Sequence, residues 1–229
     1  MERVQKLLSH AGYCSRREGE DLIEEGKVSV NGEKITLGDK ATRKDKIEVD
    51  GEEVNFDPLR YIAFHKPKNI LVSTDDPSDK DLIMDFFEDF EERIYPVGRL
   101  DYDARGLIFL TNDGDFANKV MHPRYEVEKT YQVLLDKEFD KSHVMKLSQG
   151  ITLDDGSVDV DSVTVLDDKV VEITVHEGRN KLVKRIFKDL GYWVEGLVRT
   201  NIGSVQLGNL LPGEWRELSE EEISYFKKK

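Results

Sequence analysis

The chain has 229 residues, of which 38% are hydrophobic and 35% charged, and its formal net charge is −13. No apolar run approaches the ~20 residues of a membrane span, the first residues lack the apolar core of a secretion signal, and Cys14, the single cysteine, excludes an internal disulfide. The composition predicts a water-soluble protein of the reducing cytoplasm, with one large or two smaller domains.

Residues 1–56 have the pattern of a small domain of two helices and a hairpin. Apolar residues at helical spacing between Val4 and Ala11 predict a first helix. Ser15 and Glu18 form a capping box that starts a second helix, which ends at Gly26. An alternating segment follows, and Asn31-Gly32 is a hairpin turn signal because both residue types tolerate positive φ. A further strand is expected around residues 47–49.

This first segment resembles the RNA-binding domain named after ribosomal small-subunit protein four. The resemblance depends on the order of motifs, which are Ala11-Gly12, Ser15-Arg16-Arg17, Leu22-Ile23, Gly26-Lys27-Val28 and Val30-Asn31-Gly32. Arg16 and Arg17 lie at the junction of the two expected helices, where guanidinium groups and free backbone amides can bind phosphates. We therefore expect both arginines to contact RNA; the alternative is a structural domain with solvated arginines.

A short linker at residues 54–58 leads to a second expected domain, residues 60–229. Apolar patterns predict strands at 61–64, 107–111, 128–135, 157–166 and 169–175, and helices at 82–90, 115–121 and 180–190. Few helices, many strands and hairpin-length connections predict an α+β fold around a mainly antiparallel mixed sheet.

Gly98-Arg99-Leu100-Asp101 is the most informative stretch of the chain, because it places a cation and a carboxylate just before a buried strand. Asp101 has three interpretations: a turn residue, a structural ion-pair partner or a catalytic carboxylate. The charged loop that follows, from Tyr102 to Gly106, leads into a strand too apolar to be exposed. Charged loops on rigid strands are where functional sites are built.

The expected helix at 180–190 carries a cationic stripe. Lys181, Lys184, Arg185 and Lys188 follow the spacing i, i+3, i+4 and i+7. Between Arg179 and Arg199 there are six bases and two acids, whereas acids gather in residues 75–92 and 154–168. The stripe predicts contact with RNA phosphates, and a plain surface helix is the alternative. Lys66 belongs to an acid-free segment, residues 60–68, and is also expected to contact RNA.

The second domain resembles the RsuA/RluB family of ribosomal RNA pseudouridine synthases. The motifs that carry the resemblance occur in family order: Lys66-Pro67-Lys68, Tyr95-Pro96-Val97-Gly98-Arg99-Leu100-Asp101, Gly106-Leu107, Leu110-Thr111-Asn112-Asp113-Gly114, His122-Pro123, Glu128-Lys129-Thr130-Tyr131, Glu177-Gly178-Arg179-Asn180, Arg199-Thr200, Ile202-Gly203, Leu207-Gly208 and Pro212-Gly213-Glu214-Trp215-Arg216. The resemblance implies isomerisation of uridine to pseudouridine in ribosomal RNA. Three of these motifs look more like the RluB-type branch that acts on large-subunit RNA: Tyr95-Pro96-Val97-Gly98, Glu177-Gly178-Arg179-Asn180 and Pro212-Gly213-Glu214-Trp215-Arg216.

The resemblance also implies roles for single residues. Asp101 matches the family's catalytic aspartate, acting on ribose as nucleophile or as base. Arg179 matches its partner arginine, Tyr131 the tyrosine that stacks on the uracil, and Arg99 a residue that contacts RNA beside an extruded nucleotide. The reaction needs no cofactor, and the five dispersed histidines predict no metal site. We expect a monomer.

Two departures from the family pattern support other hypotheses. Ala104 stands where the family usually has threonine, and Leu182 where it usually has glutamine. With the acidic net charge, they leave open a non-catalytic RNA-binding factor of ribosome assembly. A hydrolytic nucleosidase that uses the same aspartate is a third hypothesis, and it would release free uracil.

Overall fold

The computed structural model describes residues 1–73 and 80–229, so the beginning of the acidic stretch at 75–92 lies outside the described residues. The chain forms two compact units. Unit 1 comprises Met1–Arg60, Asp89–Ile94 and Asn112–Gly114, and unit 2 comprises Tyr61–Glu88, Tyr95–Thr111 and Asp115–Lys229. No helix among the described residues has the length and apolar character required to cross a bilayer.

Unit 1 contains the two helices and the hairpin that the sequence predicts. Its elements are β1 (Glu2–Arg3), α1 (Val4–His10), α2 (Arg16–Glu24), β2 (Val28–Val30), β3 (Glu33–Lys34), β4 (Lys40–Ala41), β5 (Ile47–Val49) and β6 (Glu52–Glu53). The capping box of α2 is present: the Ser15 hydroxyl accepts from the Glu18 amide at 3.2 Å, and the Glu18 carboxylate accepts from the Ser15 amide at 2.6 Å. Asn31 and Gly32 both have positive φ and form the two-residue turn between β2 and β3.

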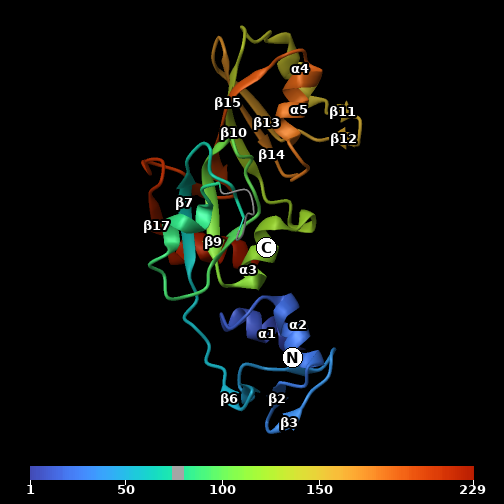
Figure 1. The fold of residues 1–229 in the computed structure, drawn as a ribbon. Helices are drawn as coiled ribbons and strands as arrows, with labels where there is room; N and C mark the ends of the chain where they lie inside the picture. The colour runs from blue at the N-terminus through green and yellow to red at the C-terminus, as the bar shows by residue number, and fades with distance from the viewer. Residues whose placement is uncertain (74–79) are drawn as a thin grey trace. The chain divides into compact units, whose positions relative to one another are not determined.

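Unit 2 contains, within its described residues, a nine-stranded sheet (Figure 1). Its strands are β7 (Tyr61–Lys66), β8 (Tyr95–Val97), β9 (Arg105–Thr111), β10 (Lys129–Leu135), β13 (Ser162–Asp167), β14 (Val170–Val175), β15 (Val194–Ile202), β16 (Val205–Gln206) and β17 (Trp215–Glu217). The order is β13-β14-β10-β15-β9-β7-β17, with β8 paired to β9 and β16 to β15. Only the β15–β9 pair among these is parallel. The predicted α+β fold with a mainly antiparallel mixed sheet is confirmed.

Helices and a small hairpin surround this sheet. They are η1 (Ile83–Phe87), α3 (Gly114–Met121), η2 (Pro123–Tyr125), α4 (Ser142–Ser148), β11 (Ile151–Leu153), β12 (Gly156–Val158), α5 (Leu182–Asp189) and α6 (Glu220–Lys228). Figure 1 shows α4, α5 and the β11–β12 hairpin at the end of the sheet formed by β13 and β14.

Two predicted elements differ in the structure. The helix expected at 82–90 is a 3₁₀ helix over Ile83–Phe87. It is shorter than expected, and the acids from Glu88 on oppose its extension because they lie at the negative end of the helix dipole. The strand expected at 157–166 is two strands: Val158 completes the hairpin with Ile151, and Ser162 begins a new pairing with Thr174.

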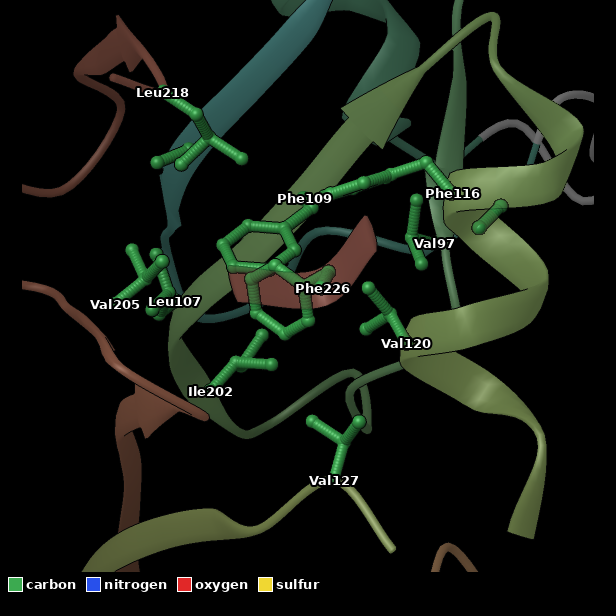
Figure 2. Close-up of a cluster of buried hydrophobic side chains, with 12 residues drawn as sticks. Val97, Leu107, Phe109, Phe116, Val120, Val127, Ile202, Val205, Leu218 and Phe226 are labelled. Carbon is green, nitrogen blue, oxygen red and sulfur yellow. The ribbon is translucent and has the colours of Figure 1, made fainter. Parts of the chain in front are cut away.

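The core of unit 2 anchors β9. Three aromatic rings meet there, from Phe109 on β9, Phe116 on α3 and Phe226 on α6 (Figure 2), with the Phe226 centroid 5.6 Å from Phe109 and 5.4 Å from Phe116. Burying each such side chain stabilises the fold by roughly 1.5–3 kcal/mol. The neighbouring strands β8 and β9 are therefore held firmly, and the loop that connects them, residues 98–104, has fixed ends.

Candidate active site

Asp101 lies on the loop between β8 and β9, and backbone contacts define the shape of this loop. The Ala104 amide donates to the Asp101 carbonyl at 3.1 Å, and the Asn69 amide donates to the Tyr102 carbonyl at 2.8 Å. At Gly106, just beyond the loop, the backbones of β9 and β15 lie close together. A Cβ there would lie 2.3 Å from the Arg199 carbonyl oxygen, and φ is +114°, so only glycine lets β15 pack beside β9 here.

The Lys66 ammonium also holds this loop in place, through hydrogen bonds to backbone carbonyl oxygens. Its side chain is 0% exposed, and Nζ donates to the carbonyl oxygens of Pro67 (2.9 Å), Tyr102 (3.3 Å) and Ala104 (2.8 Å). Burial lowers the pKa of Lys66 to about 8, although the charges of Asp103 and Asp101 act to raise it. The expectation that Lys66 contacts RNA is wrong, because no part of this side chain reaches the surface.

The cation that pairs with Asp101 is Lys184 on α5. The Lys184 Nζ lies 3.2 Å from Oδ2 of Asp101 and 2.6 Å from Oδ1 of Asp103. Burial acts to lower the pKa of Lys184, but its hydrogen bonds to Asp103 and Asp101 outweigh it, so the pKa is above its ordinary value. The bond to Lys184 also lowers the pKa of Asp103. Asp101 thus has a permanent ammonium beside it.

Arg179, the partner expected for Asp101, is engaged elsewhere. Its Nε donates to Glu177 at 2.6 Å, Nη1 donates to Asp155 at 3.0 Å, and Nη2 donates to the Ser157 carbonyl. The expected Asp101–Arg179 pair is therefore corrected to Asp101–Lys184. The physical reason is that the β11–β12 hairpin presents acceptors next to Arg179, whereas α5 points Lys184 at the loop.

A cavity of about 620 Å³ opens beside Asp101, and Arg179 and Tyr131 both line it. Its other walls combine apolar side chains, such as Val175, Leu197 and Ile202, with cations. This volume is in the range of small-molecule sites. The structure thus brings Asp101, Tyr131 and Arg179 around one cavity, although Asp101 and Arg179 do not form the expected ion pair.

Lys129 and Arg199 also line the cavity, although the sequence pattern predicts no role for either residue. Tyr131 on β10 is directly opposite Arg199 on β15. Lys129 shares the Tyr131 face because side chains two residues apart in a strand point the same way. The sequence signal for Lys129 was this two-residue spacing. Arg199 had no such signal, since an arginine inside a strand is ordinarily taken as exposed.

The residues predicted to bind RNA have different environments. Arg99, at the cavity, and Lys181 and Lys188 on the α5 segment are exposed. Arg16 and Arg17 are exposed at the start of α2 in unit 1.

The predicted cationic stripe is not a free phosphate-binding surface, because its two middle members are paired within the protein. Arg185 is in ion pairs with Asp154 and with Asp155, and Lys184 pairs with the Asp101 loop. Lys181 has positive φ and lies ahead of the first helical residue, so it is not part of the helix. Only the two ends of the stripe remain available.

The two departures from the family pattern are both apolar contacts in the cavity wall. Ala104 and Leu182 are buried and line the cavity. Neither side chain carries a charge that would need a partner inside the protein. Within residues 1–73 and 80–229, no group of three or more His, Cys, Asp or Glu side chains is arranged to hold a metal ion.

A family model described as RNA pseudouridylate synthase matches residues 60–189, more than half of the chain. The chain belongs to this family. A model of the S4 domain matches residues 2–47. As a pseudouridine synthase, the enzyme isomerises uridine to pseudouridine within RNA.

Relatives of this synthase match over nearly its whole length. Ribosomal large subunit pseudouridine synthase B of Bacillus subtilis (strain 168) is 43% identical, covering 97% of this chain and 94% of its own. The dual-specificity RNA pseudouridine synthase RluF of Escherichia coli (strain K12) is 36% identical, covering 96% of this chain and 77% of its own. A crystal structure of a pseudouridylate synthase superposes with a TM-score of 0.72 at 30% identity, covering 99% of this chain and 100% of that one.

Proposed function

We propose that this synthase modifies a uridine of large-subunit ribosomal RNA and that Asp101 is the carboxylate that acts on the ribose. The observation that carries the catalytic assignment is the Lys184 ammonium 3.2 Å from Asp101 at the edge of the cavity. Attack on C1′ and removal of a ribose proton both require an ionised carboxylate. Lys184 supplies the counter-charge for either role.

The target uridine enters the cavity after leaving its stack, at a cost of a few kcal/mol. Arg99, exposed on the loop that carries Asp101, contacts the RNA next to the extruded nucleotide. A planar guanidinium suits this position because it both stacks on bases and donates hydrogen bonds. Tyr131 stacks on the uracil inside the cavity. Arg179 forms part of the cavity wall, and its hydrogen bonds to Asp155 and Glu177 hold its guanidinium there.

The ribosomal target is supported by the relatives. The Bacillus subtilis relative is named as a synthase of the large ribosomal subunit, and its match covers nearly all of this chain. Residues 1–56 bind the RNA, with Arg16 and Arg17 as phosphate contacts, and residues 60–229 carry out the reaction. We propose that the protein is a monomer and works on ribosomal RNA in the cytoplasm.

The decisive experiment is to incubate the protein with a large-subunit RNA transcript and to map pseudouridine chemically. Asp101→Asn keeps the size of the side chain and removes its charge, so we expect product formation to fall by about 10⁴-fold, the upper end for loss of a general base. Asp103→Asn is the matched control, since Asp103 shares Lys184 but is more exposed. It is expected to stay within about tenfold of wild type, a change of about 1.4 kcal/mol.

The other hypotheses give different results in this experiment. A binding-only assembly factor forms no pseudouridine, and a nucleosidase releases free uracil. Equal product from wild type and Asp101→Asn would remove Asp101 from the mechanism.

A further inference from the structure

Lys129 and Arg199 lie in the wall of the cavity, and neither forms an ion pair with a carboxylate among the described residues. Arg199 is 6% exposed, and its Nε donates to the Leu107 carbonyl at 2.7 Å, but its Nη2 has no hydrogen-bond partner within the described part of the chain. Burial, together with the weaker effects of the Arg199 and Lys229 charges, lowers the pKa of the neighbouring Lys129 to about 8. No carboxylate of the described residues is among the causes of this shift. Arg199 therefore lacks, within residues 1–73 and 80–229, the anion that ordinarily accompanies a buried cation.

Both residues belong to the lining of the same cavity as Tyr131. Arg199 is opposite Tyr131, Lys129 lies two residues before Tyr131, and all three line the cavity. The bond from Nε to Leu107 fixes the plane of the guanidinium, so Nη2 has a defined direction. A buried donor without a partner costs about 1–3 kcal/mol. A molecule that brings an acceptor to Nη2 recovers this free energy.

The reaction creates such an acceptor. When the C1′–N1 bond breaks, its electron pair stays on the uracil, and the negative charge spreads to the O2 and O4 oxygens. The ring then turns and C5 forms a new bond to C1′. If Asp101 is the nucleophile, its ester bond to C1′, formed as N1 leaves, breaks in this step; if Asp101 is the base, the ribose proton that it took returns to the same carbon. The proton on C5 then leaves and N1 takes up a proton, so that product and substrate are isomers. The uracil leaves with this electron pair whether Asp101 acts as nucleophile or as base.

We propose that Arg199 and Lys129 bind the carbonyl oxygens of the uracil and stabilise its negative charge while it is detached from the ribose. The proposal rests on the assignment of the Asp101 cavity as the site of the reaction. Stabilisation by preorganised donors in a water-excluded site is a large term in catalysis, because the donors need no reorganisation as charge develops.

The cavity wall favours a base over a phosphate as the occupant. Val175, Leu197 and Ile202 line the same region, and apolar surface suits the faces of a heterocycle. A phosphate retains its charge before, during and after the reaction and would gain nothing from apolar neighbours. The two occupants differ in a measurable way, because only a phosphate contact contributes to the salt dependence of RNA binding.

The test uses the full chain with Arg199→Met and, separately, Lys129→Met. Lys129→Met removes no hydrogen bond within the described residues, so it keeps the test valid if Arg199→Met fails to fold. Lys146→Met, an exposed position on α4, is the control. RNA affinity at several salt concentrations and the single-turnover rate are measured with a uridine substrate and with 5-fluorouridine at the target position. Loss of the original nucleoside is followed by chromatography of digested RNA.

We expect each cavity variant to lower the single-turnover rate on uridine by about 10²–10³-fold, as removal of one such donor does elsewhere. RNA affinity and its salt slope stay at the wild-type values. Fluorine withdraws electrons from the ring and makes the base a better leaving group, so the deficit is smaller with 5-fluorouridine.

Three results would overturn the inference: a wild-type rate in both variants, an equal deficit on the two nucleosides, or a lower salt slope with an unchanged rate, which identifies a phosphate contact. The proposed function fails on a different measurement, equal product from wild type and Asp101→Asn.

Discussion

Lys66 shows how a charge can serve the site without touching RNA. Its ammonium has three N–H groups, and three carbonyl oxygens around it accept them. Lys66→Met fills much of the same space but leaves these carbonyls without their donor. We expect the free energy of unfolding to fall by about 3 kcal/mol, the range for a buried polar network that loses one partner. Denaturant unfolding of the two proteins at pH 7 measures this difference.

The pH dependence of that difference provides a control. The pKa of Lys66 is about 8 in the folded protein and near 10.5 in the unfolded chain. Between these values the unfolded state binds more protons, so the Lys66 contribution to stability increases as pH rises. Wild type should gain about 2 kcal/mol relative to Lys66→Met from pH 8 to pH 10. A pH-independent difference would show that Lys66 titrates normally.

At the residue scale, the sequence identifies a reactive side chain more readily than it identifies the ion-pair partner of that side chain. Asp101 was singled out because a carboxylate precedes an apolar strand, and the structure places it at a cavity. Its partner could not be read from the sequence, since Arg179 and Lys184 are both cations after β14 and only the tertiary position of α5 decides between them. Lys66 was misread because charge in a sequence carries no information on burial.

At the element scale, the sequence predicts those helix ends and turns that depend on interactions between residues close together in the chain. The capping box of α2 and the Asn31-Gly32 turn act over a few residues, and both are present. The central strand β15 was missed because its buried positions include Arg199 and its pattern reads as polar. The helix α6 was also missed, although Ser219 and Glu222 form a second capping box that the sequence displays.

The β11–β12 hairpin restrains two cations that RNA could use. Asp155 pairs with both Arg179 and Arg185, and the bond to Arg185 is the main reason that its pKa falls to about 2. RNA must therefore compete with a carboxylate that stays charged at any working pH. We expect Asp155→Asn to tighten RNA binding and to steepen its salt dependence by about one unit for each phosphate newly contacted. Binding titrations at several salt concentrations measure both.

Glu195→Gln is the charge-matched control for this prediction. Glu195 is an exposed acid on β15, and the substitution changes the net charge by the same amount without releasing a guanidinium. If both variants tighten binding equally, the effect is one of net charge, and the hairpin has no specific role.

At the scale of the whole molecule, a net charge of −13 coexists with RNA as substrate. Ion pairs such as those of Asp155 and Asp103 in unit 2 do not remove this excess, because each pair uses one acid and one cation. The positions of exposed cations therefore decide where a polyanion can bind. In unit 1, Arg16 and Arg17 are exposed at the amino end of α2, where the helix dipole adds to their charge. Affinity for a polyanion depends on such unpaired groups and much less on the total.

The double variant Arg16→Ser with Arg17→Ser tests whether unit 1 binds RNA through this helix start. Each phosphate contact contributes about 0.7–0.9 to the slope of log affinity against log salt. We therefore expect weaker binding at low salt and a slope smaller by up to about two units. Lys40→Ser with Lys44→Ser removes the same charge from exposed positions of the same unit and should bind as wild type. Equal losses in the two double variants would mean that RNA responds to the overall charge of unit 1 and not to the start of α2.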